Sequence, residues 1–238
     1  KTAIVIGAGR GIGKAIALGY AEAGAAVVCA ARTSAEIQDT VRQIKASGGR
    51  GKAVQTDVTN LSEVQKMISI SADSFGGPDI LVCAAGVYHE DKMAEESDPD
   101  LWQATLSVNL MGPYYSARSI IPYFKKRGGG KIIMIGSGLG HRGKAGGTAY
   151  ACSKAGLWML TRVLAQEVWQ YNISVNELIP GPVRTDMTSE ATATSGKPKI
   201  SSEWLKVPEE VVPLALFLAE QPLIGPTAQS FSLMRRDN

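Results

Sequence analysis

Short runs of β-branched and apolar residues alternate with longer amphipathic runs along almost the whole chain. Apolar runs of about four to eight residues predict buried strands, and an apolar period of about 3.6 residues predicts the helices between them. Strands that alternate with helices form right-handed crossovers and a parallel sheet, with ligand loops at the carboxyl ends of the strands. We therefore expect one α/β domain over residues 1–238, with a doubly wound, mostly parallel seven-stranded sheet and helices on both of its faces.

The strand pattern occurs in the runs Thr2–Ile6, Ala26–Ala30, Lys52–Thr56, Ile80–Ala84, Lys131–Ile135, Ile173–Leu178 and Gln229–Leu233. The helical pattern occurs in the runs Gly11–Ala23, Ala35–Ser47, Leu61–Ser74, Leu101–Lys126, Tyr150–Tyr171 and Pro208–Ala219. This order predicts the Rossmann-like form of the doubly wound sheet. One segment, Asp186–Ser202, is polar and has no apolar period. A polar loop of that length is usually a lid or disordered, and its place just after a strand end favours a substrate lid over residues 186–202.

Bulk composition excludes several classes of protein. Charged residues make up 20% and hydrophobic residues 45% of the chain, as in an ordinary soluble globular protein. The net charge of +3 is too small and too scattered for a nucleic-acid partner, and no apolar run approaches the ~18 residues of a membrane span. The 3 cysteines and 2 histidines lack metal-ligand spacing, so we expect no metal site and a cytoplasmic location. The chain begins at Lys1 and enters a strand at once, so we expect missing upstream residues, which could include a removed targeting segment.

A glycine-rich turn, Gly7–Gly13, joins the first expected strand to the first expected helix. Glycines allow a tight turn and let backbone amides approach a pyrophosphate at the helix N-terminus. The spacing G-x-G-x-x-G does not fit, because it would need a glycine at Ile12 or at Lys14, whereas G-x-x-x-G-x-G does fit. A glycine turn alone is a weak signal for nucleotide binding. The dinucleotide contacts that we expect here are Gly7, Gly9, Arg10, Gly11, Ile12 and Gly13.

The end of the second expected strand favours NADP over NAD. Enzymes that use NAD usually place an acidic residue there to bind the ribose 2′-hydroxyl. This strand ends in Ala30-Ala31-Arg32, with no carboxylate and with a guanidinium immediately after it. The planar guanidinium suits a phosphate at the 2′ position, and Arg10 points to the same choice. An alternative interpretation leaves both arginines as ordinary surface charges.

Tyr150 and Lys154 are separated by four residues, and Ser137 lies thirteen residues before the tyrosine. On a helix, positions i and i+4 share a face, so an ammonium can stand beside a phenol. A hydroxyl from another segment completes a proton donor for a carbonyl oxygen. Ser137 closes an apolar strand and Tyr150 opens a long helical run, as this arrangement requires.

The same spacing occurs a second time, at Tyr88 and Lys92, so it can arise by chance. Phe75, which has no hydroxyl, lies thirteen residues before Tyr88, and Glu90-Asp91 suits a polar loop better than a helix interior. We therefore expect only the pair at Tyr150 to be catalytic.

Further motifs extend over essentially the whole chain. They are Gly7-x-x-x-Gly11-x-Gly13, Asp57-Val58, Ala85-Gly86, Asn109, Ser137, Tyr150-x-x-x-Lys154 and Pro180-Gly181-Pro182-Val183-x-Thr185. In order and spacing they resemble the short-chain dehydrogenase/reductase family, and the chain is similar to the subgroup that includes 3-oxoacyl-carrier-protein reductases and steroid and polyol dehydrogenases. The resemblance implies an oxidoreductase that uses a nicotinamide dinucleotide, and a homotetramer.

The resemblance also implies roles for single residues. Asp57 would hold the adenine amino group and Val58 would line its pocket, while Ala85 and Gly86 would pass beneath the cofactor. Asn109 would hold a water that links Lys154 to solvent, and Lys154 would also bond the ribose hydroxyls. The contacts expected around the nicotinamide and the phosphates are Pro180, Gly181, Val183 and Thr185.

Two departures from the family pattern stand out. The family's Asn-Asn-Ala-Gly is here Cys83-Ala84-Ala85-Gly86, so an asparagine that braces neighbouring strands is absent. The tail, residues 232–238, lacks the Asp-Gly-Gly ending that is common in the subgroup. We expect the first departure to loosen a support without removing any chemistry, whereas the second concerns the substrate pocket or a subunit contact.

These residues together predict hydride transfer with acid–base catalysis. An unperturbed tyrosine has a pKa of ~10, and an ammonium ~4 Å away at an effective dielectric of ~20 favours the phenolate by ~4 kcal/mol, roughly three pKa units before desolvation opposes it. We expect Tyr150 to act as acid in ketone reduction and as base in alcohol oxidation, with Ser137 bonding the substrate oxygen.

The leading hypothesis is an NADPH-dependent reductase of a small ketone or aldehyde. The alternatives are an NAD-dependent alcohol or polyol dehydrogenase, a 3-oxoacyl-carrier-protein reductase, and a sensor that binds the dinucleotide without turnover. Specificity should come from residues 138–147 and 186–202, which do not identify a ligand. His141 lies in the first of these loops, and we expect it to be an ordinary loop histidine because no proton role is left unfilled.

Overall fold

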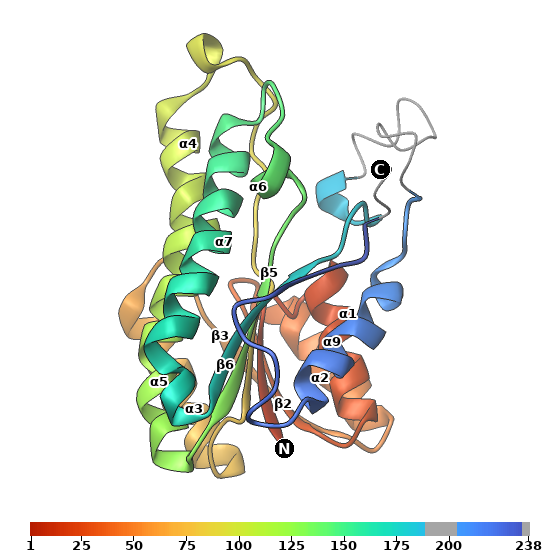
Figure 1. Cartoon of the computed structure of the whole chain (residues 1–238). Helices are drawn as coiled ribbons and strands as arrows, with labels where there is room; N and C mark the ends of the chain where they lie inside the picture. Colours follow the sequence, from red (N-terminus) through yellow and green to blue (C-terminus); the bar gives the residue numbers. More distant parts are fainter. Residues whose placement is uncertain (189–203, 235–238) are drawn as a thin grey trace.

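Seven parallel strands form one sheet, in the order β3-β2-β1-β4-β5-β6-β7 (Figure 1). The computed structural model describes residues 1–188 and 204–234. The strands are β1 (Thr2–Ile6), β2 (Ala26–Ala31), β3 (Arg50–Gln55), β4 (Ile80–Cys83), β5 (Gly130–Ile135), β6 (Ile173–Ile179) and β7 (Ser230–Ser232). Each neighbouring pair is parallel, so the expected Rossmann-like sheet is confirmed, and it is parallel throughout rather than mostly parallel.

Helices cover both faces of this sheet (Figure 1). The α-helices are α1 (Gly11–Glu22), α2 (Ser34–Ala46), α3 (Leu61–Phe75), α4 (Pro99–Leu106), α5 (Gly112–Arg127), α6 (Leu139–Arg142), α7 (Thr148–Val168) and α9 (Val212–Glu220). Short 3-10 turns occur at η1 (Ala94–Glu96), η3 (Trp169–Tyr171) and η4 (Pro208–Val211), and η2 (Ser107–Met111) is a π-helical segment. Among the described residues, no helix is long and apolar enough to cross a membrane.

The core has two layers because successive strand residues point to opposite faces of the sheet. In β1, Ile4 and Ile6 pack with α3, α5 and α7, whereas Ala3 and Val5 pack with α1, α2 and α9. Both faces are covered, so all five residues of β1 are buried. This double burial explains why the strands are continuous apolar runs in the sequence rather than alternating ones.

Helix α3 shows how local sequence sets the ends of an element. Its N-cap, Asn60, accepts hydrogen bonds from the amides of Ser62 and Glu63 through its side chain. Its C-cap, Gly76, has φ 77, a left-handed conformation that is inexpensive only for glycine. The helix is therefore placed by its own flanking residues, as the sequence pattern predicts.

The expected helix over residues 101–126 is wrong in one respect, because it is not a continuous α-helix. It is divided into α4, the π segment η2 and α5. Asn109 lies in η2, is fully buried, and bonds the backbone of Val87 in a remote segment. Helical periodicity carries no information about that distant partner, which is why the interruption was missed. Such π segments are frequent at functional sites.

Two further expectations need correction or fall outside the described residues. Strand β3 begins at Arg50 rather than at Lys52, because its pairing with β2 starts at Ala26 opposite Arg50. The short helix α6 lies in the glycine-rich segment 138–147, which was expected to be only a loop. Of the expected lid at 186–202, residues 189–202 lie outside the described residues.

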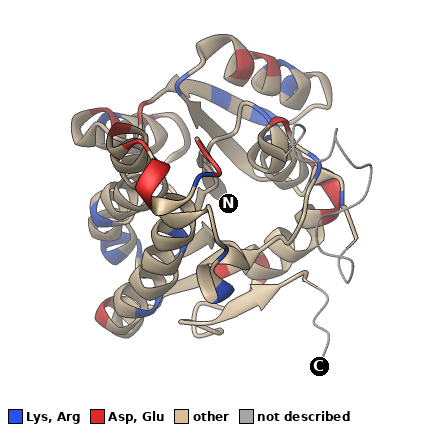
Figure 2. Cartoon of the chain, turned by 90° about the horizontal axis from the view of Figure 1, so that it is seen from above, with Lys and Arg blue, Asp and Glu red and all other residues tan. Residues whose placement is uncertain are grey.

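Lysine and arginine residues, and aspartate and glutamate residues, are distributed over several of the helices in the view from above (Figure 2). Some residues of opposite charge form ion pairs. The ion pairs Lys14–Asp39 and Arg127–Asp79 are examples, at 3.0 and 2.7 Å.

Candidate active site

The candidate site lies at the carboxyl ends of β1, β4 and β5. Strand β1 has β2 on one side and β4 on the other, so the strand order reverses at this point of the sheet. Doubly wound sheets bind ligands in the crevice outside such a reversal. Gly7 follows β1, Ala84 follows β4 and Gly136 follows β5, so the sequence motifs converge on this crevice.

The glycine turn is built so tightly that side chains are excluded from it. Gly7 has φ 83, and a Cβ on it would lie 2.6 Å from the amide nitrogen of Ala85. A Cβ on Gly13 would overlap the carbonyl oxygen of Gly7. The turn thus holds the start of α1 directly against the chain that leaves β4.

The N-terminus of α1 is suited to an anionic group. Its N-cap, Arg10, makes no side-chain capping bond, and its first turn holds no acidic residue. The first amides of a helix lack intrahelical partners and carry the positive end of the helix dipole. The turn and this helix end therefore fit the pyrophosphate of a dinucleotide.

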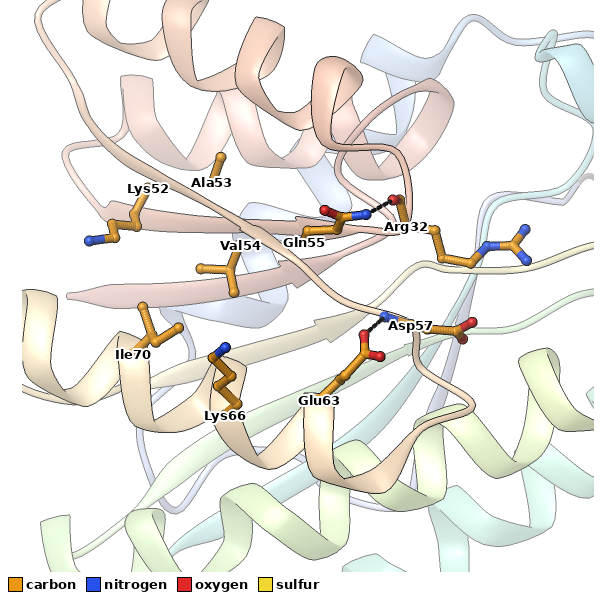
Figure 3. A pocket seen from close by; sticks show the side chains of 9 residues that line it. All are labelled: Arg32, Lys52, Ala53, Val54, Gln55, Asp57, Glu63, Lys66 and Ile70. Carbon is orange, nitrogen blue, oxygen red and sulfur yellow. Dashed lines mark hydrogen bonds between the residues drawn. The ribbon is translucent and has the colours of Figure 1, made fainter.

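A pocket of about 710 Å³ opens between the end of β2, strand β3 and helix α3 (Figure 3). Its lining residues are Arg32, Lys52, Ala53, Val54, Gln55, Asp57, Glu63, Lys66 and Ile70. Gln55 Nε2 donates to the Arg32 carbonyl at 3.0 Å, and Glu63 accepts from the Asp57 amide at 2.8 Å. These bonds fix the two backbone turns from which the Arg32 and Asp57 side chains extend to the same side (Figure 3).

Val58 lies apart from this pocket lining. It is 5% exposed, and a Cβ on Gly112 of α5 would lie 2.8 Å from its Cγ2. The side chain is therefore packed against α5. Its expected role in the adenine pocket stays a prediction.

Two charged side chains at the glycine turn differ from the expectation that Arg10 is directed at the cofactor phosphate and that no carboxylate lies nearby. Arg10 pairs with Asp186 at 3.1 Å, and both side chains are well exposed. A Cβ on Gly9 would lie 2.6 Å from Glu36 Oε2, so a carboxylate of α2 lies against the turn. Glu36 was not among the residues predicted from the sequence, because the acidic residue typical of NAD enzymes is expected at the end of β2 and Glu36 lies in α2. The available signal was an acidic residue in the first turn of the next helix.

The segment after β6 closes the crevice from the other side. Pro180 follows this strand, Gly181 has φ 69, and Val183 is 3% exposed. A Cβ on Gly11 would lie 3.2 Å from Thr185 Cγ2, so Thr185 rests on the glycine turn. The structure therefore brings this motif to the expected dinucleotide cradle.

Tyr150 and Lys154 lie one turn apart on the first half of α7, as the spacing predicts. Lys154 is 5% exposed, and its Nζ donates to the Ile135 carbonyl at 2.7 Å and lies 5.8 Å from the centre of the Tyr150 ring. Ser137 follows β5 and is hydrogen-bonded to Tyr150. Helix α7 and the segment after β5 thus bring a phenol, an ammonium and a hydroxyl together.

The pKa of Tyr150 does not follow the sequence expectation. Burial raises it, and the hydrogen bond with Ser137 opposes part of that rise, while the Tyr88 phenol adds to it. Lys154 does not lower it as expected, because its ammonium is directed at the Ile135 carbonyl. Burial also lowers the pKa of Lys154 to about 8, against the opposing charges of Glu177 and Cys83. Desolvation therefore outweighs the pairwise attraction in this site.

Asn109 braces the cofactor side of the site. Its Oδ1 accepts from the Val87 amide at 2.8 Å, and its Nδ2 donates to the Val87 carbonyl at 2.9 Å and to Ser153 at 3.1 Å. A Cβ on Gly86 would lie 3.5 Å from Asn109 Oδ1 and 3.9 Å from Lys154 Nζ. The side chain thus positions the Ala85-Gly86 backbone. The expected water beside Asn109 stays a prediction.

Sequence reasoning missed Tyr88 as part of this site. The segment around Tyr88 and Lys92 is irregular, so the two side chains do not share a helix face, as the sequence interpretation held. The Tyr88 ring nevertheless lies 4.9 Å from the Tyr150 ring, and burial raises its pKa. The only signal in the sequence was its place two residues after Gly86, where the chain leaves the expected cofactor floor.

Comparison with known proteins agrees with this geometry. The sequence model of the family described as short chain dehydrogenase matches residues 1–196. A 3-oxoacyl-[acyl-carrier-protein] reductase of Synechocystis sp. is 35% identical over 235 residues, covering 98% of this chain and 95% of the relative. The chain therefore belongs to the short-chain dehydrogenase/reductase family.

Solved structures support the same conclusion. A short-chain type dehydrogenase/reductase of Mycobacterium marinum has a TM-score of 0.92 and 32% identity, with 98% of this chain and 94% of that one covered. A protein of Beutenbergia cavernae described as an NAD(P)-dependent gluconate 5-dehydrogenase, with NADP bound at low occupancy, has a TM-score of 0.89, 33% identity and the same coverage. The chain is thus an oxidoreductase of a family that binds NAD(P) and acts on CH–OH or C=O groups.

Proposed function

We propose that this protein transfers hydride between NADP(H) and a small ketone, aldehyde or secondary alcohol, with Tyr150 as general acid and base. The observation that carries the proposal is the meeting of the Tyr150 phenol, the Ser137 hydroxyl and the Lys154 ammonium beside the glycine turn. A dinucleotide sensor without turnover could use Lys154 to bind the ribose, but it would not need a buried phenol hydrogen-bonded to the Ser137 hydroxyl.

The acid–base roles follow from the protonation states. Burial raises the pKa of Tyr150, so the phenol holds its proton near neutrality and can donate it to a carbonyl oxygen. Ser137 would bond the same oxygen and stabilise the negative charge that develops there. The Lys154 ammonium would stabilise the phenolate that remains after Tyr150 has donated its proton. The same ammonium would bond the ribose. Bound NADPH would supply the hydride.

The choice of NADP rests on Arg32. It follows β2 and lines the 710 Å³ pocket, its side chain extends to the same side as that of Asp57, and no carboxylate ends β2 (Figure 3). A guanidinium binds a phosphate through parallel hydrogen bonds, which a ribose hydroxyl cannot reproduce. The relative with bound NADP is consistent with this choice.

Steady-state kinetics with both cofactors test the choice. We expect lower KM for NADPH than for NADH, and Arg32→Ala should raise the KM for NADPH about tenfold or more while changing that for NADH little. Arg42→Ala is a matched control, because Arg42 lies on α2 and pairs with Asp39. Equal or better use of NADH by the unaltered protein would overturn the NADP assignment.

One observation favours an NAD-dependent alcohol or polyol dehydrogenase instead. The Glu36 carboxylate lies against Gly9, where it would repel a nearby 2′-phosphate. Glu36→Gln separates the two cases. If the enzyme uses NADP, this change should lower or leave unchanged the KM for NADPH, whereas an NAD enzyme should bind NADH less tightly without the carboxylate.

The substrate class is a small carbonyl compound in this proposal, with a 3-oxoacyl chain on a carrier protein as the main alternative. The relatives described as a 3-oxoacyl-[acyl-carrier-protein] reductase and as a gluconate 5-dehydrogenase suggest two substrate classes to test, which are 3-oxoacyl thioesters and sugar acids. A panel of ketones, sugar acids and 3-oxoacyl thioesters, followed through NADPH absorbance, would distinguish them. Activity only on carrier-bound thioesters would replace the small-carbonyl proposal.

We also infer a homotetramer in a reducing, cytoplasmic setting. Exposed apolar side chains gather on α4, α5 and α7 and their junctions, and those that support an interface are Leu101, Met111, Tyr114, Met159 and Val163. Cys29 and Cys83 are buried and free, which agrees with a compartment that keeps thiols reduced. Sedimentation equilibrium measures the oligomeric state, and a monomer at micromolar concentration would contradict the tetramer.

A further inference from the structure

Glu177 is a buried carboxylate beside the catalytic residues, and the proposed reaction does not use it. It lies in β6, and its exposed fraction is 0%. It pairs in register with Met134 of β5, which belongs to the core layer under α7. Paired residues of neighbouring strands face the same side of a sheet, so Glu177 lies on the face covered by the helix that carries Tyr150 and Lys154.

The carboxylate runs alongside the end of β5. A Cβ on Gly136 would overlap Glu177 Oε1, so these two residues are in direct contact. On the preceding residue, the Ile135 carbonyl accepts the hydrogen bond from Lys154 Nζ at 2.7 Å. The next residue is Ser137. The Glu177 carboxylate and the Lys154 ammonium therefore both contact the chain just before Ser137, the carboxylate at Gly136 and the ammonium at Ile135.

Two further elements hold the carboxylate. His141 Nε2 lies 3.0 Å from Oε2 and 3.3 Å from Oε1, and the Ser230 hydroxyl of β7 donates to Oε2. His141 belongs to α6, which is four residues long and has no side-chain cap. So short a helix is not stable by itself. The bond to Glu177 thus fixes the segment that follows Ser137.

A buried charge is costly unless an opposite charge or hydrogen bonds compensate for it. Glu177 has the two hydrogen bonds, and Lys154 supplies the opposite charge nearby. Burial lowers the pKa of Lys154 to about 8, and the negative charge of Glu177 is the larger of the two effects that oppose this fall. Removal of the carboxylate would therefore bring the lysine closer to losing its proton at neutral pH.

We propose that Glu177 is a positioning residue for the reaction, whose carboxylate keeps Lys154 as an ammonium and, through His141, anchors α6 beside Ser137. The proposal rests on the proposed function, since it assigns a purpose to the same site. Neither part needs a direct contact between Glu177 and substrate or cofactor. It explains why β6 carries an acid on the face where its other residues, Ile173 and Val175, are apolar.

Other ionisable groups also face this pair in the described part of the chain. Cys83 of β4 interacts with Lys154, the Tyr150 ring lies 5.8 Å from its Nζ, and His141 contacts Glu177. Burial raises the pKa of Cys83 to about 12, so this thiol is neutral in the working range. The charge that changes the state of Lys154 near neutrality is consequently that of Glu177.

Glu177→Gln tests the proposal because it removes the charge but keeps the side-chain size and an oxygen for Ser230 and His141. The pH profile of kcat should keep its shape, with its high-pH limb displaced downward by about one unit, equivalent to about tenfold less ammonium above the midpoint. The melting temperature should show that the variant is folded. A high-pH limb within ~0.3 unit of the unaltered enzyme would overturn the electrostatic role.

Ser230→Ala is the matched control, since it removes a neutral donor from the same carboxylate and leaves the charge in place. Its pH profile should stay within ~0.3 unit of the unaltered enzyme. A displacement equal to that of Glu177→Gln would show that local packing, rather than charge, is responsible, and would also overturn the proposal.

A second measurement separates this proposal from the proposed function. The rate of acetylation of Lys154 by acetic anhydride, followed against pH by mass spectrometry, reports the lysine's protonation without any turnover. In Glu177→Gln its midpoint should fall by about one unit. If the acetylation midpoint falls in a protein that reduces no carbonyl, the effect of Glu177 on the protonation of Lys154 is retained and the proposed reaction is refuted. An unchanged midpoint in an active enzyme would refute the link alone.

Discussion

Two tyrosine–lysine pairs with identical spacing lie on different kinds of backbone in this protein. Tyr150 and Lys154 occupy α7, where four residues bring the side chains to one face, and Lys154 is buried. Tyr88 and Lys92 lie in an irregular segment after β4, where Lys92 is exposed. A spacing therefore becomes a shared site only when the backbone between the two residues is helical.

The two regions nevertheless meet. The Tyr88 ring lies 4.9 Å from the Tyr150 ring, tilted by 56°. The irregular segment supplies an aromatic wall, whereas the helix supplies the buried charge and the hydroxyl contact. We infer that chemistry belongs to the helical pair and that Tyr88 only shapes its surroundings, which the following variants can test.

The largest expected effect is on the helical tyrosine. Tyr150→Phe removes the proton donor, and kcat should fall about 10²- to 10⁴-fold. NADPH binding, measured by fluorescence titration, should change little because the phenol is not needed to hold the pyrophosphate. A variant with near-normal kcat would remove Tyr150 from the mechanism.

Ser137→Ala should have the next largest effect. The change deletes a hydrogen-bond donor to the substrate oxygen, so kcat should fall about 10²-fold or more, with KM for NADPH nearly unchanged. Ser174→Ala provides the control, because Ser174 is also buried but lies near the opposite end of β6. Equal losses in both variants would indicate a general loss of packing.

The two lysines should differ in how they link stability to pH. The pKa of Lys154 is lowered to about 8 from 10.5, so between these values the unfolded chain holds more protons than the folded one, and stability should rise with pH. Lys154→Met should therefore stabilise the fold by about 1–3 kcal/mol near neutrality, and the gain should shrink as the pH approaches the upper value. Urea unfolding at several pH values measures this, with Lys92→Met as the exposed control. A gain that grows with pH would contradict the sign.

Tyr88→Phe should have the smallest effect. The Tyr88 hydroxyl interacts with Lys144 and Asp91, and the proposed proton transfer does not use it. Its removal should lower stability by no more than about 1 kcal/mol and change kcat less than about threefold. A loss of kcat like that of Tyr150→Phe would mean that both pairs are catalytic.

Local sequence was sufficient for the elements that depend on local rules. Strand β1, the glycine turn and the start of α1 form one contiguous segment whose apolar run and glycine spacing predict it directly. The spacing of Tyr150 and Lys154 likewise needs only a helix. The seven parallel strands and their two helical layers followed from the alternation of patterns.

The features that escaped prediction depend on distant partners or on burial. The π segment at Asn109 is tied to Val87, which lies 22 residues away in the sequence. The contact of His141 with Glu177 joins residues that are 36 apart in the sequence, and the residues near either one do not predict it. The pKa of Tyr150 was expected to fall and instead rises, because burial cannot be read from a spacing of residues.

Transfer of an isotope tests the central claim most directly. The unaltered protein would be incubated with each ketone of the panel in turn and with NADPH that carries two deuterium atoms on the C4 carbon of its nicotinamide, and the products would be analysed by mass spectrometry. The account predicts one deuterium on the carbinol carbon of the alcohol, and none when Tyr150→Phe replaces the unaltered protein over the same time. Bound NADPH with no labelled alcohol from any member of the panel would contradict it.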